Sequence, residues 1–262
     1  VFNVVESVFG AGIYSSIAPA MLDRLNIPYT GATAAHFAAT TDKPFGKNVL
    51  KVGGVVTPHW AVGPDWDGLD LDAMYIVKAA DEDSSVGIDD ASVVRGSEVK
   101  ARAEYCRKKF GGRWFAEQYV DGREFNIAVM ASDQGPHVFP LAEMRFNDAW
   151  PDGKPKLVSF AAKWEEDTFD YNGSQRRFGC EDEEPELARQ LIETTKKVWH
   201  LFSLRGYARV DYRVDKNNKP WVLEINPNCC ISTDAGFAAA AEQAGIPYDE
   251  LINRVALAAL HA

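Results

Sequence analysis

Two segments near the end of the sequence carry acidic and amide side chains at a spacing that could bind a metal ion. YARVDYRV at 207–214 and PWVLEIN at 220–226 both alternate as strands do, so every second residue shares a face. The polar face of the first segment carries Arg209, Asp211 and Arg213. The matching face of the second carries Val222, Glu224 and Asn226. The two segments therefore predict a hairpin with its polar groups on one side.

The register of this hairpin decides which side chains meet. With a loop centred on residues 217–218, antiparallel pairing places Asp211 across from Glu224, and Arg209 across from Asn226. Facing carboxylates repel unless a cation lies between them. An oxygen-only set of Asp, Glu and Asn suits Mg²⁺, which completes its shell with waters and phosphates. The alternative is a solvated hairpin face on which the arginines neutralise the acids.

Three lysines stand where an anion could be bound. Lys78 ends the apolar run MYIVK and is followed by a short loop with Ser84 and Ser85, whose hydroxyls could hold phosphate. Lys163 likewise ends VSFAAK, and Lys43 opens KPFGK. Each could instead be an exposed lysine beside its neighbouring acids. Together with an acidic Mg²⁺ face, however, they are what a nucleoside triphosphate site requires, although GxxxxGK[ST] is absent.

Strands and helices alternate along the chain without a strict βαβ rhythm. We expect strands at VFNVV, MYIVK, HVFPLAEMRF and KLVSFAAKW, and a hairpin between WFAEQYV and REFNIAVM around Asp121-Gly122. Helices are expected at IAPAMLDRL, KPFGKNVLKVG, about 97–110 and PELARQLIETTKKVWHLF, whereas the polar stretch 165–184 reads as a loop. This pattern predicts an α+β fold with antiparallel sheets.

The composition excludes several classes of protein. The chain has 262 residues with a net charge of -10, which argues against binding to nucleic acid or anionic membranes. No apolar window is long enough to span a bilayer and no basic secretion signal precedes VFNVV, so we expect a cytoplasmic protein. The four cysteines form no CxxC pair, and we expect Cys229 and Cys230 to be reduced packing residues.

Six blocks now make the sequence recognisable. In order they are DKPFGK, YIVKAADEDSSVGI, FAEQYVDGREF, AAKW, GYARVD and LEINPN. The set resembles the ATP-grasp ligases, and within them the D-alanine–D-alanine ligase branch. The resemblance implies two α+β subdomains that grip ATP, with residues 1–32 as the remnant of a Rossmann-like N-terminal domain. A lid subdomain would cover 33–116, and a nucleotide and metal subdomain would cover 117–262.

The resemblance also implies roles for individual residues around ATP. Lys43 and Lys78 match phosphate-binding lysines, and Lys163 matches the lysine that reaches the transferring phosphate. Ser84 and Ser85 belong to the loop that closes over the triphosphate. The adenine hinge would comprise Glu117, Gln118 and Val120. Glu124 matches the carboxylate that binds ribose, unless it is an exposed acid paired with Arg123.

The metal and catalytic positions match as well. Asp211, Glu224 and Asn226 correspond to the ligands of Mg²⁺, with Mn²⁺ as a substitute. Arg209 corresponds to the arginine that stabilises charge on the transferred phosphate. The implied reaction joins a small carboxylate to an amine through an acyl phosphate made with ATP. A homodimer is plausible by resemblance.

The acceptor side departs from the D-alanine ligases. Cys229 and Cys230 stand where those enzymes have a proline and a glycine, and their substrate-binding serine falls at about Ala235. Trp164 replaces a usual tyrosine. We therefore expect ATP binding but substrates other than two D-alanines. Alternatives are a non-catalytic ATP-binding module or inactive ligase fragment, and a metal-dependent hydrolase using the acids of the hairpin.

Overall fold

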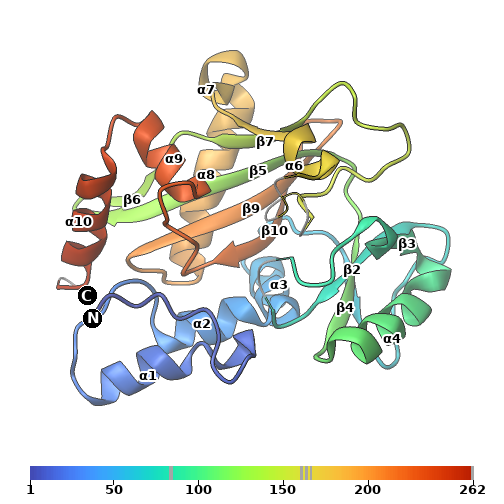
Figure 1. The fold of residues 1–262 in the computed structure, drawn as a ribbon, viewed down its shortest axis with the longest axis horizontal. Coiled ribbons are helices and arrows are strands. Elements are labelled where there is room, and N and C mark those ends of the chain that lie inside the picture. Colours follow the sequence, from blue (N-terminus) through green and yellow to red (C-terminus); the bar gives the residue numbers. More distant parts are fainter. Residues whose placement is uncertain (83–84, 160–161, 163–164, 166, 261–262) are drawn as a thin grey trace.

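The computed structural model describes residues 1–82, 85–159, 162, 165 and 167–260 (Figure 1). The helices are α1 Ile17–Arg24, α2 Ala34–Thr41, α3 Lys43–Val52, α4 Val99–Phe110, α6 Phe169–Gly173, α7 Cys180–Glu183, α8 Pro185–Leu201, α9 Gly236–Gln243 and α10 Tyr248–Ala258. Short 3₁₀ turns cover Gly12–Tyr14, Asp90–Ser92 and Gly96–Glu98. The strands are β1 Trp60–Val62, β2 Met74–Ala79, β3 Val93–Arg95, β4 Trp114–Gln118, β5 Gly122–Ser132, β6 Gly135–Val138, β7 Ala142–Phe146, β8 Ser174–Arg177, β9 Tyr207–Asp215 and β10 Pro220–Asn226.

The strands form two sheets whose pairings are all antiparallel in the described part of the chain. The smaller sheet has four strands in the order β1-β4-β2-β3. The larger has six, in the order β10-β9-β5-β7-β8, with β6 paired to β5. The predicted α+β architecture with antiparallel sheets is confirmed.

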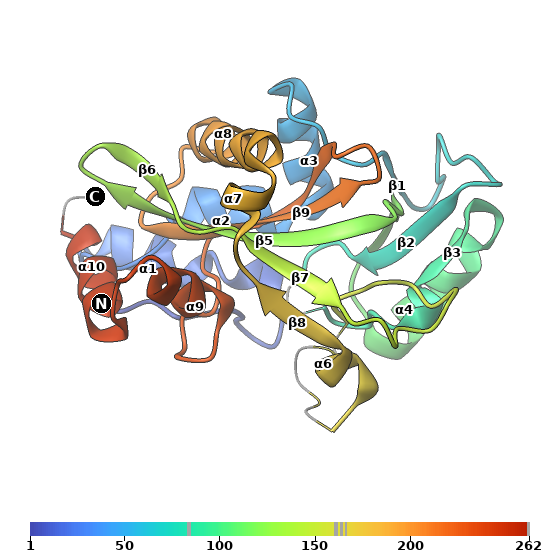
Figure 2. The same ribbon diagram turned by 90° about the horizontal axis from the view of Figure 1, so that it is seen from above.

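Helices cover both faces of the larger sheet (Figure 2). On one face, Leu187, Leu191 and Val198 of α8 pack against the alternate β5 residues Phe125 and Ile127. On the other, residues of α9 and α10 form a second core with β5 and β9 that includes Ala128, Met130, Tyr207, Phe237 and Leu251. The smaller sheet packs one face against α4, around Val77, Ala103 and Cys106. Each sheet is thus held rigid by its own apolar core.

The chain passes from one sheet to the other at residues 119–121. The predicted hairpin at Asp121-Gly122 is wrong, because β4 belongs to the smaller sheet and β5 to the larger. Gly122 begins β5 opposite Asp215, and a Cβ added there would lie 2.1 Å from the carbonyl oxygen of Val214. The glycine is therefore needed for close approach to β9 rather than for a tight turn.

Two predicted strands and one predicted loop differ in the structure. VFNVV forms no strand, because Pro28 has no N–H to donate and the N–H of Asn3 goes to the Thr30 hydroxyl at 2.9 Å. Residues 156–159 of the expected KLVSFAAKW strand are not a strand, and much of the remainder lies outside the described residues. The supposed loop 165–184 contains α6, β8 and α7. The stretch resembled a loop because both faces of β8 carry polar side chains, so the strand lacks the alternation of apolar and polar residues.

The helix at KPFGKNVLKVG is confirmed as α3. Asp42 is its N-cap and accepts a hydrogen bond from the N–H of Phe45 at 3.0 Å. Lys43 occupies the first turn, and Lys47 lies one turn later on the same side of the helix. Among the described residues no helix is long and apolar enough to cross a membrane.

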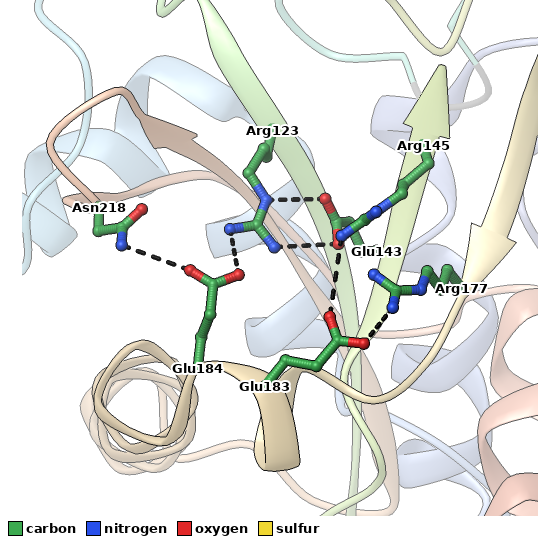
Figure 3. A network of polar contacts seen from close by, with 7 residues as sticks. All are labelled: Arg123, Glu143, Arg145, Arg177, Glu183, Glu184 and Asn218. Atoms are coloured by element: carbon green, nitrogen blue, oxygen red, sulfur yellow. Dashed lines mark hydrogen bonds and ion pairs between the residues drawn. The ribbon is translucent and has the colours of Figure 1, made fainter. Parts of the chain in front are cut away.

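A polar network ties β5, β7 and β8 to the start of α8 (Figure 3). Arg123 of β5 donates to Glu143 of β7 at 2.7 and 3.0 Å and to Glu184 at 2.6 Å. Arg177 of β8 pairs with Glu183. Burial raises the pKa of Glu143, but the charges and hydrogen bonds of Arg123 and Arg145 outweigh it and hold the pKa below the ordinary value. Glu143 is therefore ionised within a nearly closed site.

We predict that Glu143→Gln destabilises the fold near neutral pH by about 1–3 kcal/mol, since it removes the charge from a buried hydrogen-bonded pair. The folded-state pKa of Glu143 is lowered, so its contribution is complete above the ordinary pKa of 4.5 and is lost as the pH falls through the folded value. The difference in stability between wild type and variant, measured by urea unfolding, should thus be constant above the ordinary pKa and shrink as the pH falls below it. Glu193→Gln on the exposed face of α8 is the control and should change little. A difference that stays constant as the pH falls below the ordinary pKa would contradict the assignment.

Candidate active site

A cleft of about 780 Å³, partly open to solvent, lies between the two sheets. Its lining comes from both sheets, from the start of α3, from residues 82, 85, 86 and 88, and from residues 157–158. The lining residues are Lys43, Ile76, Lys78, Ala79, Glu82, Ser85, Val86, Ile88, Glu117, Tyr119, Val120, Glu124, Leu157, Val158, Asp211, Arg213, Leu223 and Glu224. Most of the described residues expected to bind ATP therefore meet at one site.

The predicted register of the β9–β10 hairpin is confirmed at the acidic residues. Asp211 pairs with Glu224, and Arg209 pairs with Asn226. The turn itself differs from the prediction, because Val222 pairs with Tyr212 and the ladder is shifted by one residue near the turn. A bulge between Val222 and Glu224 restores the register, so the expected pairs form for a reason that the alternating pattern did not contain.

Because of the bulge, Val222 lies on the face opposite to the one predicted. That residue is fully buried in the core with Ile225, whereas Leu223 and Glu224 both line the cleft. Val222, Glu224 and Asn226 thus do not share a face. The extra residue of the bulge turns the second half of β10 and directs the Glu224 carboxylate to the same side as Asp211.

The hairpin offers an oxygen-rich set of ligands. Asp211 is buried, and Arg209 donates to its two oxygens at 2.7 and 2.8 Å. Nδ2 of Asn226 donates to Asp211 at 3.0 Å, which leaves the amide oxygen of Asn226 to accept or ligate. No group of three His, Cys, Asp or Glu side chains among the described residues could hold a metal, and a metal bound at this hairpin would therefore take the amide oxygen of Asn226 as a third protein ligand. Two carboxylates and an amide oxygen fit Mg²⁺ or Mn²⁺.

Arg209 remains charged in this setting. Burial lowers the pKa of its guanidinium, but the charge and hydrogen bonds of Asp211 outweigh burial and raise the pKa above the ordinary value. The carboxylate of Glu224 contributes in the same direction. Arg209 is therefore a fixed cation beside the acidic pair, in a position to meet negative charge on a bound group.

Two of the predicted phosphate-binding lysines lie in the cleft. Lys43 and Lys78 are both buried. Nζ of Lys43 donates to the carbonyl of Glu82 at 2.6 Å and lies 3.9 Å from Glu224. Nζ of Lys78 lies 2.7 Å from Oε1 of Glu117. The structure thus brings cations of α3 and β2 to the acidic hairpin face.

Lys47 is a charged residue of the site that the sequence reasoning missed. Its side chain is 1% exposed, its ammonium pairs with Glu117, and it donates to the Thr57 hydroxyl at 2.8 Å. Burial lowers the pKa of Lys47, and the Glu117 charge opposes that shift. The available signal was the spacing of four residues from Lys43 within KPFGK, which places both on one helix face.

Glu117 lies between two lysines rather than at the surface of a hinge. Burial raises the pKa of its carboxyl, but the charges of Lys47 and Lys78 outweigh burial and hold the pKa below the ordinary value. The carboxylate is therefore ionised and locked between β2, β4 and α3. Thr57 extends this chain of contacts, since its hydroxyl donates to the Val222 carbonyl at 2.7 Å, at the bulge.

The remaining hinge residues surround the crossing between the sheets. Gln118 is exposed, and its backbone N–H donates to His59 at 2.7 Å. The Val120 carbonyl accepts from Arg213 at 3.0 Å, and Arg213 also lies 3.2 Å from Glu124. Glu124 therefore does not pair with Arg123, because the two side chains point to opposite faces of β5.

The phosphate loop is described only in part. Ser85 adopts a positive φ of 59°, and its hydroxyl donates to the carbonyl of Val158 at 3.2 Å. Both oxygens of Glu82 accept from the N–H of Gly12, at 3.0 and 3.1 Å. The predictions for Ser84, Lys163 and Trp164 lie outside the described residues.

The cysteine loop follows β10 beside these groups. All four cysteines are free thiols. Cys229 is buried, which raises the pKa of its thiol to about 12 and makes it a packing residue. Cys230 is exposed, with Sγ 3.0 Å from the Ser232 hydroxyl, so the packing prediction does not hold for it. Ala235 precedes α9 and provides no side-chain cap.

Sequence comparisons agree with this geometry. The family described as "D-ala D-ala ligase C-terminus" matches residues 71–256. The protein y4sG of Sinorhizobium fredii is 29% identical over 97% of this chain and 73% of its own length. A D-alanine–D-alanine ligase of a Synechococcus strain is 27% identical over 95% of this chain and 73% of its own length.

Solved structures show the same fold. A D-alanine–D-alanine ligase of Bacillus anthracis complexed with ATP aligns with a TM-score of 0.72 and 20% identity, over 93% of this chain and 74% of that one. The VanG D-Ala:D-Ser ligase of Enterococcus faecalis aligns with a TM-score of 0.72 and 14% identity, over 93% and 68%. With the family match over residues 71–256, these similarities show that the chain belongs to the D-alanine–D-alanine ligase-like branch of the ATP-grasp ligases.

Proposed function

We propose that this chain is an ATP-dependent carboxylate–amine ligase that works through an acyl phosphate. The observation that carries the proposal is the meeting of the acidic pair Asp211 and Glu224 with the buried lysines Lys43 and Lys78 around one cleft. Oxygen ligands for a divalent cation beside cations for phosphate form a site for a metal-bound nucleoside triphosphate. Membership in a family of ATP-dependent carbon–nitrogen ligases supports the same reaction.

Different residues around the cleft would bind the phosphates, the adenine and the ribose of the nucleotide. Lys43 and Lys78 bind phosphates, and Ser84 and Ser85 belong to the loop over them. Adenine is held at the crossing between the sheets by Glu117, Gln118 and Val120, where the buried Glu117 fixes Lys78 and the backbone supplies the contacts. Glu124 binds ribose. We propose three domains at 1–32, 33–116 and 117–262, and the boundary between the second and the third falls inside β4.

Asp211, Glu224 and Asn226 would hold Mg²⁺, which when bound supplies charge neutralisation on the phosphate oxygens. In the first step an oxygen of the substrate carboxylate attacks the γ-phosphorus, the bond to the leaving ADP oxygen breaks, and an acyl phosphate forms. Arg209, and by the resemblance Lys163, would stabilise the charge that develops on the transferred phosphoryl group. This assignment requires no protein nucleophile.

In the second step the amine nitrogen attacks the acyl carbon, the carbon–oxygen bond to phosphate breaks, and the amine loses a proton. Arg209 is suited to stabilise the tetrahedral oxyanion because its own partner Asp211 keeps it charged and oriented. The products are ADP, phosphate and an amide.

We propose substrates other than two D-alanines. The support is the loop after β10, where Cys230 brings an exposed side chain and Ala235 lacks a hydroxyl.

A substrate screen tests the reaction itself. Purified protein with MgATP is offered pairs of small carboxylates and amines, and ADP release with amide product is measured. We expect stimulated turnover by a pair other than D-alanine with itself. Robust D-alanyl-D-alanine formation would refute the substrate proposal, and nucleotide binding with no stimulated turnover would favour a binding module.

Replacing Arg209 tests its role in catalysis. Arg209→Ala should lower kcat by at least about 100-fold, since a preorganised cation at the transition state is lost. The affinity for ATP, measured by calorimetry, should change only a few-fold. Arg205→Ala is the matched control, because that guanidinium stacks 4.5 Å from the Tyr29 ring, and it should leave kcat nearly unchanged. Unchanged turnover in Arg209→Ala would remove this residue from the mechanism.

Replacing Lys78 tests the phosphate contacts. Lys78→Ala should raise the dissociation constant of MgATP by about 10- to 100-fold, as expected for a lost charge-assisted hydrogen bond. Lys100→Ala, at an exposed position of α4, removes the same charge away from the cleft and should bind ATP as the wild type does. Equal affinities for the two variants would count against a phosphate-binding Lys78.

A further inference from the structure

We propose that Arg176 is a specificity-determining residue that binds the carboxylate of the amine substrate, so that the acceptor is an amino acid rather than a neutral amine. The inference rests on the proposed ligase function and deepens it. Neither the family match nor the relatives assign a role to this position. Arg176 belongs to β8, within the polar stretch that the sequence pattern predicted to be a loop.

Sheet register places Arg176 on the face that carries the cleft. Arg176 pairs with Met144, Met144 with Glu124, and Glu124 with Arg213. Directly paired residues project to the same side of a sheet, so these four side chains form one row. Glu124 and Arg213 in this row line the cleft. Arg176 therefore extends the same face to the edge strand.

The neighbouring arginine faces the other way. Arg177 pairs with Glu143, and Glu143 with Phe125, which is buried in the core beneath α8. The Arg177 side chain lies in the network with Glu183 on that face (Figure 3). Two adjacent arginines of one strand thus project to opposite faces of the sheet. Of the two, Arg177 forms a close ion pair among the described residues.

The surroundings of Arg176 connect it to the acceptor loop. A Cβ added to Gly236 would lie 3.4 Å from Nη2 of Arg176, so the guanidinium rests against the start of α9. Desolvation lowers the pKa of Arg176, the charge of Arg209 lowers it further, and Asp234 raises it. The side chain is therefore within electrostatic reach of Arg209, the cation assigned to the reacting centre.

The side chain of Arg176 makes no hydrogen bond or close ion pair within the described residues, although the charge of Asp234 is near enough to raise its pKa. Asp234 instead accepts from the Ser232 hydroxyl at 2.8 Å, in the loop that contains Cys230. Arg176 is exposed at the edge of the sheet, its guanidinium feels the charge of Arg209, and no close ion pair occupies its N–H donors, so they can bind an incoming anion.

A carboxylate is the group that fits a guanidinium, since two parallel N–H donors match its two oxygens. The amine of the acceptor must reach the acyl carbon near Arg209, and its carboxylate would then extend toward β8 and the start of α9. Ala235 offers no hydroxyl for that carboxylate. Arg176 supplies a stronger and charged donor within the same region.

The test compares Arg176→Met with Arg177→Met, which remove the same charge from adjacent positions on opposite faces. Each is assayed by kcat/KM with amino acids that support turnover and with their carboxamides, which keep the shape and amine but lose the negative charge. Arg176→Met should lower kcat/KM for the acid by about 10- to 50-fold and leave the amide unchanged. Arg176→Lys should recover part of the loss, and Arg177→Met should lose little.

Equal losses for acid and amide, or equal effects of the two variants, would overturn the role of Arg176 and leave it a charge that protects an edge strand. Calorimetry with Mg²⁺ and the non-hydrolysable analogue adenylyl imidodiphosphate separates this outcome from failure of the ligase proposal. Saturable amino-acid binding that weakens only in Arg176→Met supports the inference even without turnover. Absence of amino-acid binding to the wild type refutes it.

Discussion

The buried carboxylate of Glu117 is the interaction on which the arrangement of the site depends. It holds the ammonium groups of Lys47 and Lys78, which come from a helix against the larger sheet and from a strand of the smaller one. A charge that is 1% exposed is tolerable only when it is paired, and two unpaired lysines would be equally costly. Neither sheet can therefore move far at this point without separating charges away from water.

The same contacts reach the metal side of the cleft. Thr57 joins Lys47 to the Val222 carbonyl, and the Val222 N–H donates to Val56 at 2.9 Å. Both backbone polar groups of Val222, at the start of the bulge, are thus hydrogen-bonded to residues 56 and 57. Because the bulge decides which face Glu224 occupies, the position of a proposed metal ligand is tied to the lysines by buried hydrogen bonds. The proposed phosphate and metal sites thus share one framework of buried contacts.

Much of the fold and of the candidate site could be predicted from the sequence, because the strongest patterns lie within single segments. The alternation of β9, the capped α3 and the amphipathic α8 each follow from spacing within one segment. The failures concern partners distant in sequence. Gly122 resembles a turn glycine, yet it serves close packing against Val214, and the burial of Lys47 depends on Glu117, seventy residues away. The correct pairing of Asp211 with Glu224 depended on a bulge that compensated for a misplaced turn.

The position of β8 at the edge of the larger sheet separates two kinds of change. Among the described residues the strand pairs only with β7, and its side chains contribute nothing to the apolar cores described above. A substitution there alters the wall next to the acceptor loop without disturbing β5, β9 or the ion pairs around Glu117. The packing and the buried ion pairs of the nucleotide side therefore do not depend on the side chains of this edge strand. Such a scaffold can acquire new substrates by mutation at its margin while the energy-supplying reaction stays intact.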